Sequence, residues 1–423
     1  MGEAIKPAYG RYVLMALLAV YSINFMDRQI IAVLSPQIKA ELGLSDTQLG
    51  FLKGTAFALF YATMSIPMAM LGDRTNRVTL ISCSLALWSG MTALTGFAGN
   101  FLHLFLCRMV VGVGEAGSTP PSHSLLADYF ARDKRSTALA IYSLGVPIGT
   151  FLGLIVGGWL ATHYGWRTTL LVLGIPGVFL GLVVKSTVRD VPRGSADALA
   201  APPPRPDGLA TVARQLWSIP TYRTMVLSGA LNAFVGYALS MWLVDFYVRA
   251  GRASLAEVGI WMAVAFGVGG GIGTFTGGIA ADKFGRRNPS SYLVIPGTAM
   301  VVAAPLTIAA VLVPGMAWSV ACVFIASGLM YMSFGPLYGL VQTLAPVNNR
   351  SLAIAFYFLF QSLIGSGLGP LTVGFASDQL SHIVAPDTAL TIAIGSLCLP
   401  LFIAGLNLIL QRNRLQADLA RIP

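Results

Sequence analysis

Apolar residues in this chain are grouped into runs that are much longer than the core segments of a water-soluble protein. Twelve such runs follow one another between residues 12 and 411, and short polar segments separate them. About 20 predominantly apolar residues cross the hydrocarbon core of a bilayer as one α-helix. We therefore expect an all-α membrane protein with twelve transmembrane helices, at about 12–36, 46–71, 78–98, 101–130, 136–161, 166–186, 220–248, 255–281, 290–313, 316–345, 351–378 and 388–411.

The composition supports this class and excludes several others. Only 10% of the 423 residues are charged and 55% are hydrophobic, whereas about 25% of a soluble domain is charged. The four cysteines lie inside apolar runs and the four histidines are isolated, so neither a metal site nor a disulfide framework is indicated. A phosphate-cradling G-x-x-x-x-G-K-S/T loop is missing, which argues against an ATP-driven pump. We expect no enzymatic activity, no catalytic residue, no cofactor and no metal.

The basic residues are distributed unevenly between the two sides of the predicted membrane. Twenty of the 27 Lys and Arg residues fall on the side of the N-terminus, and two, Arg28 and Arg108, lie inside spans. Because cytoplasmic loops carry an excess of Lys and Arg, both termini are expected to be cytoplasmic in a plasma (inner) membrane protein. This distribution explains the net charge of +10 and argues against a nucleic-acid partner. The five cations assigned to the outer side are Lys39, Lys53, Arg167, Arg249 and Arg252.

A polar, proline-rich segment divides the chain into two halves. Residues 187–214 contain four prolines between positions 202 and 206, together with scattered charges. Such a composition is typical of a linker. We therefore predict an N-terminal six-helix bundle at 1–186, a cytoplasmic linker at 187–214 and a C-terminal six-helix bundle at 215–423.

Two short sequence echoes indicate that the halves are duplicated. The loop segments 72–77 (GDRTNR) and 282–287 (DKFGRR) each carry an aspartate followed by basic residues, and the two aspartates are 209 positions apart. The segment 135–140 (RSTALA) corresponds to 350–355 (RSLAIA) at an offset of 215. Two independent echoes at nearly the same offset predict paired halves, which is the organisation of many transporters.

Four ionisable residues lie deep inside predicted spans. Arg108 and Glu115 are seven residues apart in the fourth span, so both point to one helix face about 10 Å apart along the axis. Asp27 and Arg28 lie in the first span, and Arg28 projects about 100° away from Asp27, as expected of a structural residue. Charges inside a membrane mark an ion or substrate pathway by default. The alternative is a permanently neutral bridge that only holds helices together.

The loop segments and these charged spans resemble a known family. Residues 278–287 match the G-x-x-x-D-K-x-G-R-R loop motif of the major facilitator superfamily, although the first copy departs from it at Ala69 and Asn76. The motifs around Asp27 (NFMDR) and from Arg108 to Glu115 (R-x-x-x-G-x-G-E), with the GDRTNR loop, resemble the spinster family of lipid transporters. The resemblance implies the twelve-helix fold of two pseudo-symmetric six-helix bundles and transport by alternating access.

The resemblance also implies roles for individual residues. In the superfamily, the first and fourth spans line a central cavity, where Asp27 can meet Arg108 or Glu115. Burial raises the pKa of a carboxyl group and a nearby arginine lowers it, so a carboxylate that changes partners changes its proton affinity. Asp27 and Glu115 match spinster positions associated with proton binding. Arg108 matches the position associated with coupling or with the substrate headgroup.

The charged residues of the paired loops predict a cytoplasmic gate. An aspartate at a helix end accepts hydrogen bonds from arginines and from the N-terminal amides of neighbouring helices. Such a cluster can hold the two halves together on the cytoplasmic side and separate when that side opens. The alternative is that these charges only set the topology. The candidate gate residues are Asp73, Arg74, Arg77, Arg135, Asp282, Lys283, Arg286, Arg287 and Arg350.

The C-terminal half provides apolar and aromatic side chains where the N-terminal half provides charges. Such a stripe is usually ordinary packing, but a cavity with one polar and one apolar wall suits an amphiphile. The expected substrate-binding residues are Arg108, Asn24, Tyr331, Phe334, Tyr357 and Gln361. As the resemblance implies, we expect a proton-coupled transporter of a lysophospholipid- or sphingolipid-like molecule that acts as a monomer.

Two alternatives remain open. A proton-coupled drug exporter or organic-anion symporter of the same superfamily would use the same fold and the same buried charges. A non-transporting membrane receptor or scaffold is the more distant alternative.

Overall fold

The computed structural model describes residues 7–130, 138–139, 141–192, 209–285, 287–345 and 350–420. The described residues form helices and connecting turns without a β-strand, and eleven helices among them are long and apolar enough to cross a membrane. One of these, Ile141–Thr187, changes direction at Gly165, whose φ of 75° and ψ of 168° are not helical. It therefore contains the two separate spans that the sequence predicts there. The all-α membrane fold is confirmed.

The helices pack into two compact units, and each is described by itself. Unit 1 comprises Met1–Leu44, Ala56–Pro202 and Ser254–Ile260. Its complete helices are α1 (Pro7–Leu42), α3 (Ala56–Arg74), α4 (Arg77–Thr95), α5 (Phe101–Ala116), α6 (Thr119–Tyr129) and α8 (Gly145–Thr187). The first residues of α11 (Leu255–Met262) complete it.

Unit 2 comprises Ser45–Thr55, Pro203–Ala253 and Trp261–Pro423. Three of its elements are π-helical turns inside longer helices: η1 (Phe51–Thr55), η2 (Ala263–Gly269) and η4 (Gln361–Leu368). The α-helices are α2 (Asp46–Gly50), α9 (Leu209–Ser218), α10 (Pro220–Arg249), α12 (Gly270–Gly285), α13 (Ser291–Leu312), α14 (Met316–Tyr331), α15 (Phe334–Leu344), α16 (Arg350–Phe360), α17 (Gly369–Leu380), α18 (Pro386–Gly395), α19 (Cys398–Leu410) and α20 (Arg414–Leu419).

Glycines allow α8 to lie directly against α1 in unit 1. A Cβ atom added to Gly149 would lie 2.1 Å from the carbonyl oxygen of Ser22, and one added to Gly145 or Gly153 would lie 2.9 Å from atoms of Tyr21 or Met26. Such distances leave no room for a side chain. The four-residue spacing of these glycines predicts a face for close helix packing, and the structure confirms it.

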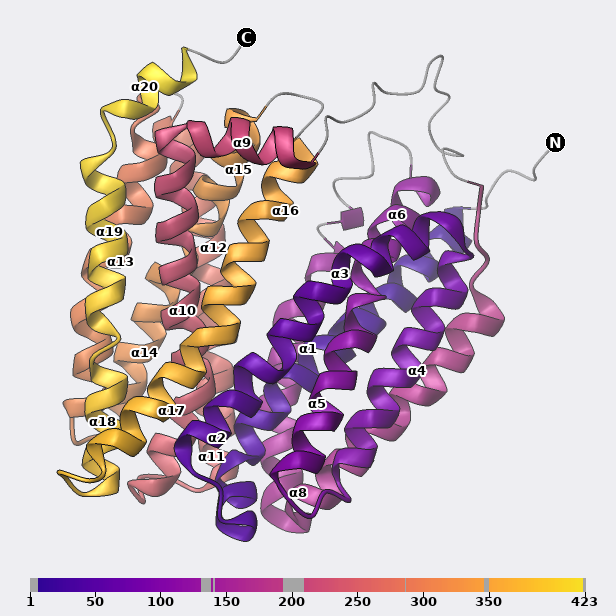
Figure 1. Cartoon of the computed structure of the whole chain (residues 1–423), viewed down its shortest axis with the longest axis vertical. Helices are drawn as coiled ribbons and strands as arrows, with labels where there is room; N and C mark the ends of the chain where they lie inside the picture. The colour runs from indigo at the N-terminus through magenta and orange to yellow at the C-terminus, as the bar shows by residue number, and fades with distance from the viewer. Residues whose placement is uncertain are drawn as a thin grey trace. The chain divides into compact units, whose positions relative to one another are not determined.

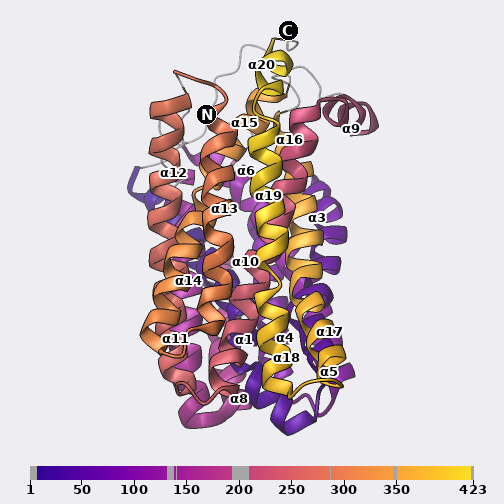
Figure 2. The same ribbon diagram turned by 90° about the vertical axis from the view of Figure 1, so that its left-hand side faces the viewer.

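In unit 2, long helices run side by side and one short helix lies across them. Figures 1 and 2 both show α13 beside α19. Helix α9 lies across one end of α10 and α16 in Figure 1, with Val212 and Leu216 buried. Its Trp217 stacks on Phe360 of α16 at 5.4 Å between ring centroids. The second part of the predicted linker, from residue 209, is therefore helical, whereas residues 193–208 lie outside the described part.

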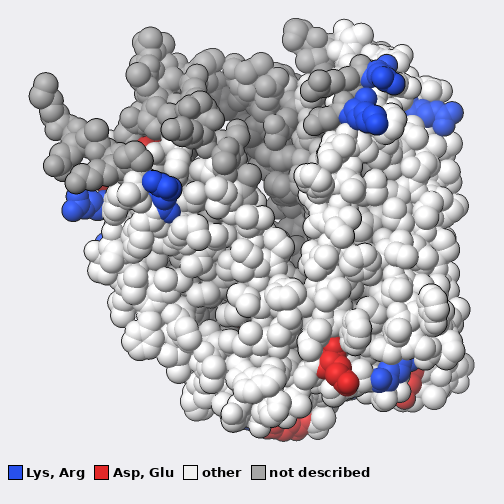
Figure 3. Space-filling view, turned by 180° about the vertical axis from the view of Figure 1, so that it is seen from behind, with Lys and Arg blue, Asp and Glu red and all other residues white. Residues whose placement is uncertain are grey.

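The surface agrees with a membrane environment. On the face shown in Figure 3, the described Lys, Arg, Asp and Glu side chains lie near the ends of the helices, and the broad band between them is uncharged. Large apolar side chains such as Phe275 and Trp318 are 70% and 73% exposed. Exposed apolar side chains in such numbers are expected where the solvent is lipid.

The α1–α8 contact gives a test of the fold. We expect Gly149→Ala to destabilise the protein by roughly 1–3 kcal/mol, because a methyl group has no space beside the Ser22 carbonyl. Gly271→Ala is the matched control, since a Cβ atom there would meet no atom within 4 Å. Thermal unfolding in detergent measures both variants. Equal melting temperatures for the two variants would contradict the close helix contact.

Candidate functional site

Helices α1 and α5 bring four buried charges together in unit 1. Arg28 Nε donates to Glu115 Oε2 at 2.8 Å, and the Glu115 side chain is fully buried. Arg108 Nη1 lies 3.5 Å from Asp27 Oδ2, and both of these side chains are at most 5% exposed. The two carboxylates are therefore balanced by the two arginines, which makes the cluster electrically neutral in a place where an unpaired charge is costly.

The spacing of the charges along each helix explains which short ion pairs form within the cluster. Neighbouring residues on a helix point about 100° apart, so Asp27 and Arg28 of α1 face different directions. Arg108 and Glu115 share one face of α5 but are separated by about 10 Å along the axis. The sequence predicts that Asp27 meets Arg108 or Glu115. The structure places Asp27 beside Arg108. It pairs Glu115 with Arg28, for which the sequence predicts only a structural role.

Glycines in α5 set the depth at which its charges lie. A Cβ atom on Gly112 would come within 2.8 Å of the Phe57 carbonyl oxygen of α3. One on Gly114 would come within 3.0 Å of Trp88 Cβ of α4. The glycines of the R-x-x-x-G-x-G-E motif therefore let α5 approach two helices closely, which carries Glu115 into the interior of unit 1.

Aromatic rings lie close to both arginines. The guanidinium carbon of Arg28 lies 4.8 Å from each of the ring centroids of Phe25, Phe57 and Tyr61. The guanidinium of Arg108 lies 5.6 Å from the Phe57 ring. Guanidinium groups at this distance from ring faces are stabilised by cation–π attraction. The Phe57 ring thus lies within cation–π distance of both arginines.

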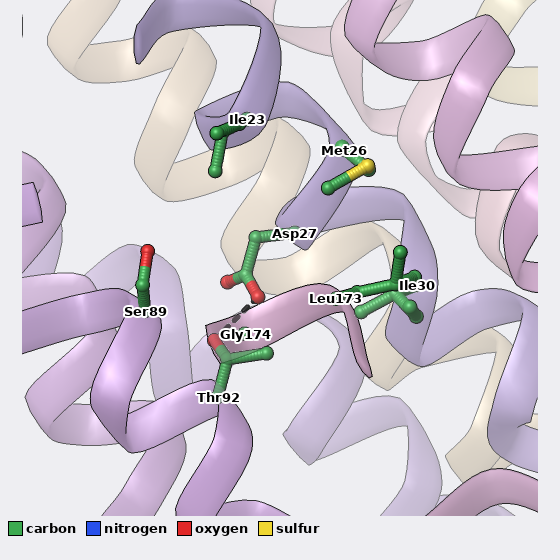
Figure 4. Close-up of a pocket in the computed structure, with 8 residues that line it drawn as sticks. All are labelled: Ile23, Met26, Asp27, Ile30, Ser89, Thr92, Leu173 and Gly174. Carbon is green, nitrogen blue, oxygen red and sulfur yellow. Dashed lines mark hydrogen bonds between the residues drawn. The ribbon is translucent and has the colours of Figure 1, made fainter. Parts of the chain in front are cut away.

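Asp27 also borders a small cavity that residues of α1, α4 and α8 line. Figure 4 shows its carboxylate beside Thr92, whose hydroxyl donates to Asp27 Oδ1. The cavity has a volume of about 10 Å³, close to the space that one water molecule needs. Ser89 also lines it, and the Ser89 hydroxyl has no hydrogen-bond partner among the described residues. The site can therefore accommodate a proton carrier the size of water next to Asp27.

Several buried polar atoms in this cluster have unused hydrogen-bonding capacity. Glu115 Oε1, Arg108 Nε and both amide atoms of Asn24 lack a hydrogen-bond partner among the described residues. Asn24 is completely buried. Buried polar atoms are normally satisfied, and exceptions often mark places where water, protons or ligands bind. In this arrangement, a proton that binds a carboxylate or an anion that binds an arginine can take the place of an internal ion-pair partner.

Unit 2 contains the predicted aromatic residues as one connected cluster. Tyr331 and Phe334 lie 4.8 Å apart, and Phe334 stacks on Tyr338 at 5.4 Å between ring centroids. Tyr338 also meets the ring of Tyr357 edge-on at 5.7 Å. Its hydroxyl lies 3.5 Å from Gln361 Oε1. Tyr357 is almost fully buried, whereas the rings of Tyr331, Phe334 and Tyr338 are partly exposed and have surface to offer a ligand.

The predicted gate residues are described only in part. Arg135 and Arg286 lie outside the described residues, as do the side chains of Asp73, Asp282 and Arg350. Arg74, Lys283 and Arg287 are exposed. The cytoplasmic gate remains a prediction.

Arg77 is the gate candidate with the most detailed surroundings. Its side chain is 1% exposed and forms ion pairs with Asp128 and with Asp190, the latter at 2.8 Å. It also donates to the carbonyl oxygen of Val191 at 2.5 Å. All these partners belong to unit 1, where Arg77 joins the start of α4 to the ends of α6 and α8.

A second cluster of buried charges was missed by sequence reasoning. Lys53, which was counted among the outer cations, lies instead inside the candidate span Asp46–Gly72 with its side chain fully buried. It forms an ion pair with Asp245 of α10, and Arg249 of α10 forms one with Asp46 at 2.7 Å. The sequence signal for this cluster was that Lys53 and Asp245 each lie inside a predicted apolar span. Only the packing of α2 and η1 against α10 shows that the charges meet.

Comparisons with known proteins agree with this architecture. The family model described as Major Facilitator Superfamily matches residues 17–370. An MFS-type efflux pump of Mycolicibacterium smegmatis is 32% identical over 365 residues, which is 86% of this chain and 84% of the relative. The sphingosine-1-phosphate transporter SPNS2 of Danio rerio is 26% identical over 389 residues, which is 85% of this chain and 74% of the relative.

A solved structure resembles the chain over nearly its full length. It is the crystal structure of a bacterial homologue of the human lysosomal transporter spinster, in an inward-facing and unoccupied conformation. The sequence identity is 31%, the TM-score is 0.89, and the match covers 98% of this chain and 99% of the other.

The Arg28–Glu115 pair gives an energetic test of the charged cluster. We expect Arg28→Met to lower the free energy of unfolding by about 3–5 kcal/mol, because it leaves a buried carboxylate without its cation. The double variant Arg28→Met/Glu115→Gln should recover much of this loss, since both charges are then absent. Unfolding in detergent measures the single and double variants. Losses that simply add would show that the two side chains do not act as a pair.

Proposed function

The chain belongs to the major facilitator superfamily, and we propose that this membrane transporter couples the movement of an amphipathic, lysophospholipid- or sphingolipid-like substrate to protons by alternating access. The observation that carries the proposal is the neutral cluster of two acid–base pairs buried in unit 1. The excess of Lys and Arg on one side of the spans further supports an orientation with both termini in the cytoplasm.

Proton coupling follows from the one-to-one pairing of the buried charges. A proton that binds Asp27 removes its negative charge, and Arg108 is then left with an unbalanced positive charge in an apolar surrounding. An anionic headgroup restores neutrality by binding Arg108. The proton and the anion therefore favour each other's binding, which is the thermodynamic requirement for coupling. Glu115 and Arg28 form a second pair that can respond in the same way.

The aromatic cluster of unit 2 offers a surface against which an apolar part of the substrate can pack. Tyr331 and Phe334 offer partly exposed rings beside Tyr338. Burial of an alkyl chain against such rings contributes about 0.8 kcal/mol per methylene group. The name of the Danio rerio relative, a sphingosine-1-phosphate transporter, supports a substrate with an anionic head and an apolar chain.

Export of a drug-like molecule is the second candidate function. The Mycolicibacterium smegmatis relative, which is 32% identical to this chain, is an efflux pump. Both candidates use the same fold and buried charges, but they differ in substrate. Purified protein in proteoliposomes with an imposed pH gradient distinguishes them. Transport of a labelled lysophospholipid supports the lipid proposal. Transport limited to small organic anions or cationic dyes would reject it.

The proton-coupling proposal predicts the behaviour of two conservative variants. In proteoliposomes, Asp27→Asn and Glu115→Gln should each abolish substrate accumulation driven by the pH gradient, because an amide cannot accept the coupled proton at these positions. Glu257→Gln is the control, since Glu257 is an exposed carboxylate bonded to Ser254. Accumulation at the native rate in both buried-site variants would exclude this coupling mechanism.

The chain-binding proposal predicts a dependence on lipid length. For the native protein, affinity should rise about fourfold for each methylene added to a lysolipid chain, until the chain exceeds the site. Phe334→Ala should flatten this dependence because it removes one of the partly exposed rings of the cluster. Trp318→Ala is the control, as Trp318 is 73% exposed and lies outside the cluster. Displacement of a fluorescent lysolipid measures the series, and parallel curves for native and Phe334→Ala protein would refute the role of the cluster.

A further inference from the structure

We propose that Ser89 and Thr92 of α4 form, together with one water molecule, the site that delivers the coupled proton to Asp27 and holds it there. The inference rests on the proton coupling proposed above, and it names the groups that carry out the protonation. It does not depend on the identity of the substrate.

The cavity beside Asp27 offers both room and polar partners for one water molecule. Its volume of about 10 Å³ is close to the space that one water needs. A buried water also needs roughly two to four polar partners. Figure 4 shows Ser89 and Thr92 projecting from α4 beside the Asp27 carboxylate, and all three residues line the cavity. The cavity therefore has the polar groups that a bound water requires.

Ser89 differs from other buried hydroxyl residues of α4 in its hydrogen bonding. Buried Ser and Thr side chains in helices commonly bond to a carbonyl oxygen of the preceding turn. Thr95 does so, because its hydroxyl donates to the Met91 carbonyl oxygen at 2.7 Å. The Ser89 side chain is equally buried, but its hydroxyl has no hydrogen-bond partner among the described residues. Since buried polar atoms are normally satisfied, a water in the cavity is the partner that fits Ser89.

Two glycines of α8 leave space around Ser89. A Cβ atom on Gly177 would lie 2.1 Å from Ser89 Oγ, and one on Gly174 would lie 2.6 Å from the Ser89 carbonyl oxygen. Gly174 also lines the cavity. A larger residue at either position would collide with Ser89. The glycines therefore allow α8 to pack closely on α4 while the Ser89 side chain keeps its place at the cavity.

The Thr92 hydroxyl suits both protonation states of Asp27. It has one hydrogen and two acceptors within reach, which are Asp27 Oδ1 and, at 3.0 Å, the Trp88 carbonyl oxygen. When Asp27 is ionised, the hydroxyl donates to the carboxylate. When Asp27 is protonated on Oδ1, the new O–H donates to Thr92 Oγ1, and the Thr92 hydrogen turns to Trp88. Thr92 therefore supplies a donor to the carboxylate and an acceptor to the acid, so neither form loses this bond in a buried place.

The protonation step needs only the proton that the pH gradient supplies. A hydronium ion at the water position gives one proton to Asp27 Oδ1, which forms an O–H bond. The hydronium becomes neutral water, and the carboxylate becomes a neutral carboxylic acid. Arg108 lies 3.5 Å from the other oxygen, Oδ2, so the step does not displace it. Arg108 is then left with the unbalanced positive charge that the proposed mechanism uses to bind an anionic headgroup.

The charged groups that act on Asp27 lie on other helices than the two hydroxyls. They are Arg28 of α1 and Arg108 and Glu115 of α5. The cavity is lined by residues of α1, α4 and α8, and those from α4 and α8 are uncharged. None of the lining residues belongs to α5. A proton held in the cavity and an anion bound to Arg108 therefore do not compete for one space.

Infrared difference spectroscopy during a pH titration tests the role of Thr92 without any transported substrate. The C=O band of protonated Asp27 is identified as the carboxyl band that Asp27→Asn lacks. In Thr92→Val this band should move to higher frequency, because the acid loses its hydrogen-bond acceptor. In Thr92→Ser, which keeps the hydroxyl, it should stay at the native position. Equal positions in native and Thr92→Val protein would overturn the role of Thr92.

The matched control is Thr95→Val, the same substitution at another buried position of α4. The Thr95 hydroxyl is bonded within its own helix, and Thr95 does not line the cavity. Its loss should leave the Asp27 band unchanged. A shift of the same size in Thr95→Val would show that the band reports general repacking of α4, and would also overturn the proposal.

The same spectra test the water site. Water O–H bands are identified by their shift when the buffer is made with water labelled by heavy oxygen. The native protein should show a water band that changes when Asp27 is protonated, and Ser89→Ala should lack it. A native spectrum without such a band, or an unchanged band in Ser89→Ala, would overturn the water site.

Transport in proteoliposomes links the site to coupling. In Thr92→Val, accumulation driven by the pH gradient should fall about tenfold, which is the effect of losing roughly one hydrogen bond of this kind. Substrate exchange without a gradient should persist, and Thr92→Ser should restore accumulation. Native accumulation in Thr92→Val would contradict the proposal.

The outcomes separate this inference from the proposed function. If no carboxyl band distinguishes native protein from Asp27→Asn at any pH, Asp27 takes up no proton, and coupling through Asp27 fails together with this inference. If the band is present but insensitive to Thr92→Val and Ser89→Ala, only this inference fails. If no lysolipid moves in any sample, the lipid proposal fails, while the infrared bands still decide the roles of Ser89 and Thr92.

Discussion

The requirement that buried charges be neutralised inside the protein underlies the organisation of both units. A single charge in the middle of a membrane span costs about 2.5–3.5 kcal/mol on insertion scales. In unit 1, Asp27 and Glu115 are matched by Arg108 and Arg28. In unit 2, Asp245 is matched by Lys53. Pairs of this kind contribute little net stability compared with apolar packing. Charged residues in helices that are otherwise almost entirely apolar are functional more often than stabilising.

Glycine positions determine which charges meet. Helix α5 lies close to α3 and α4 because Gly112 and Gly114 leave no side chain in the contact, and Glu115 is carried inward as a result. Gly50 and Gly54 do the same where α2 and η1 meet η4 and α17, and they bring Lys53 to α10. In both places the positions of the charged side chains depend on neighbouring glycines, which have no side chain. Substitution of these glycines would therefore alter function without touching a charge.

The two charged clusters have different surroundings, which suggests a division of labour. In the unit 1 cluster, Glu115 Oε1 and Arg108 Nε have no hydrogen-bond partner among the described residues, and a cavity close to the size of a water molecule lies beside Asp27. It is therefore suited to binding protons and an anionic group. The unit 2 cluster is closed by Trp242 and by hydrogen bonds to Asp46. It is therefore suited to holding a contact.

Hydropathy alone determined the class and the spans of this protein, because a run of about 20 apolar residues is a local property of the chain. It also identified Asp27, Arg108 and Glu115, since a charge in an apolar run is visible without knowledge of its neighbours. The tertiary structure alone decided that Glu115 pairs with Arg28 and that Lys53 is buried against Asp245 rather than lying in an outer loop. These outcomes depend on how each helix is rotated and how closely it packs. Both are set by contacts between residues as far apart in sequence as Lys53 and Asp245.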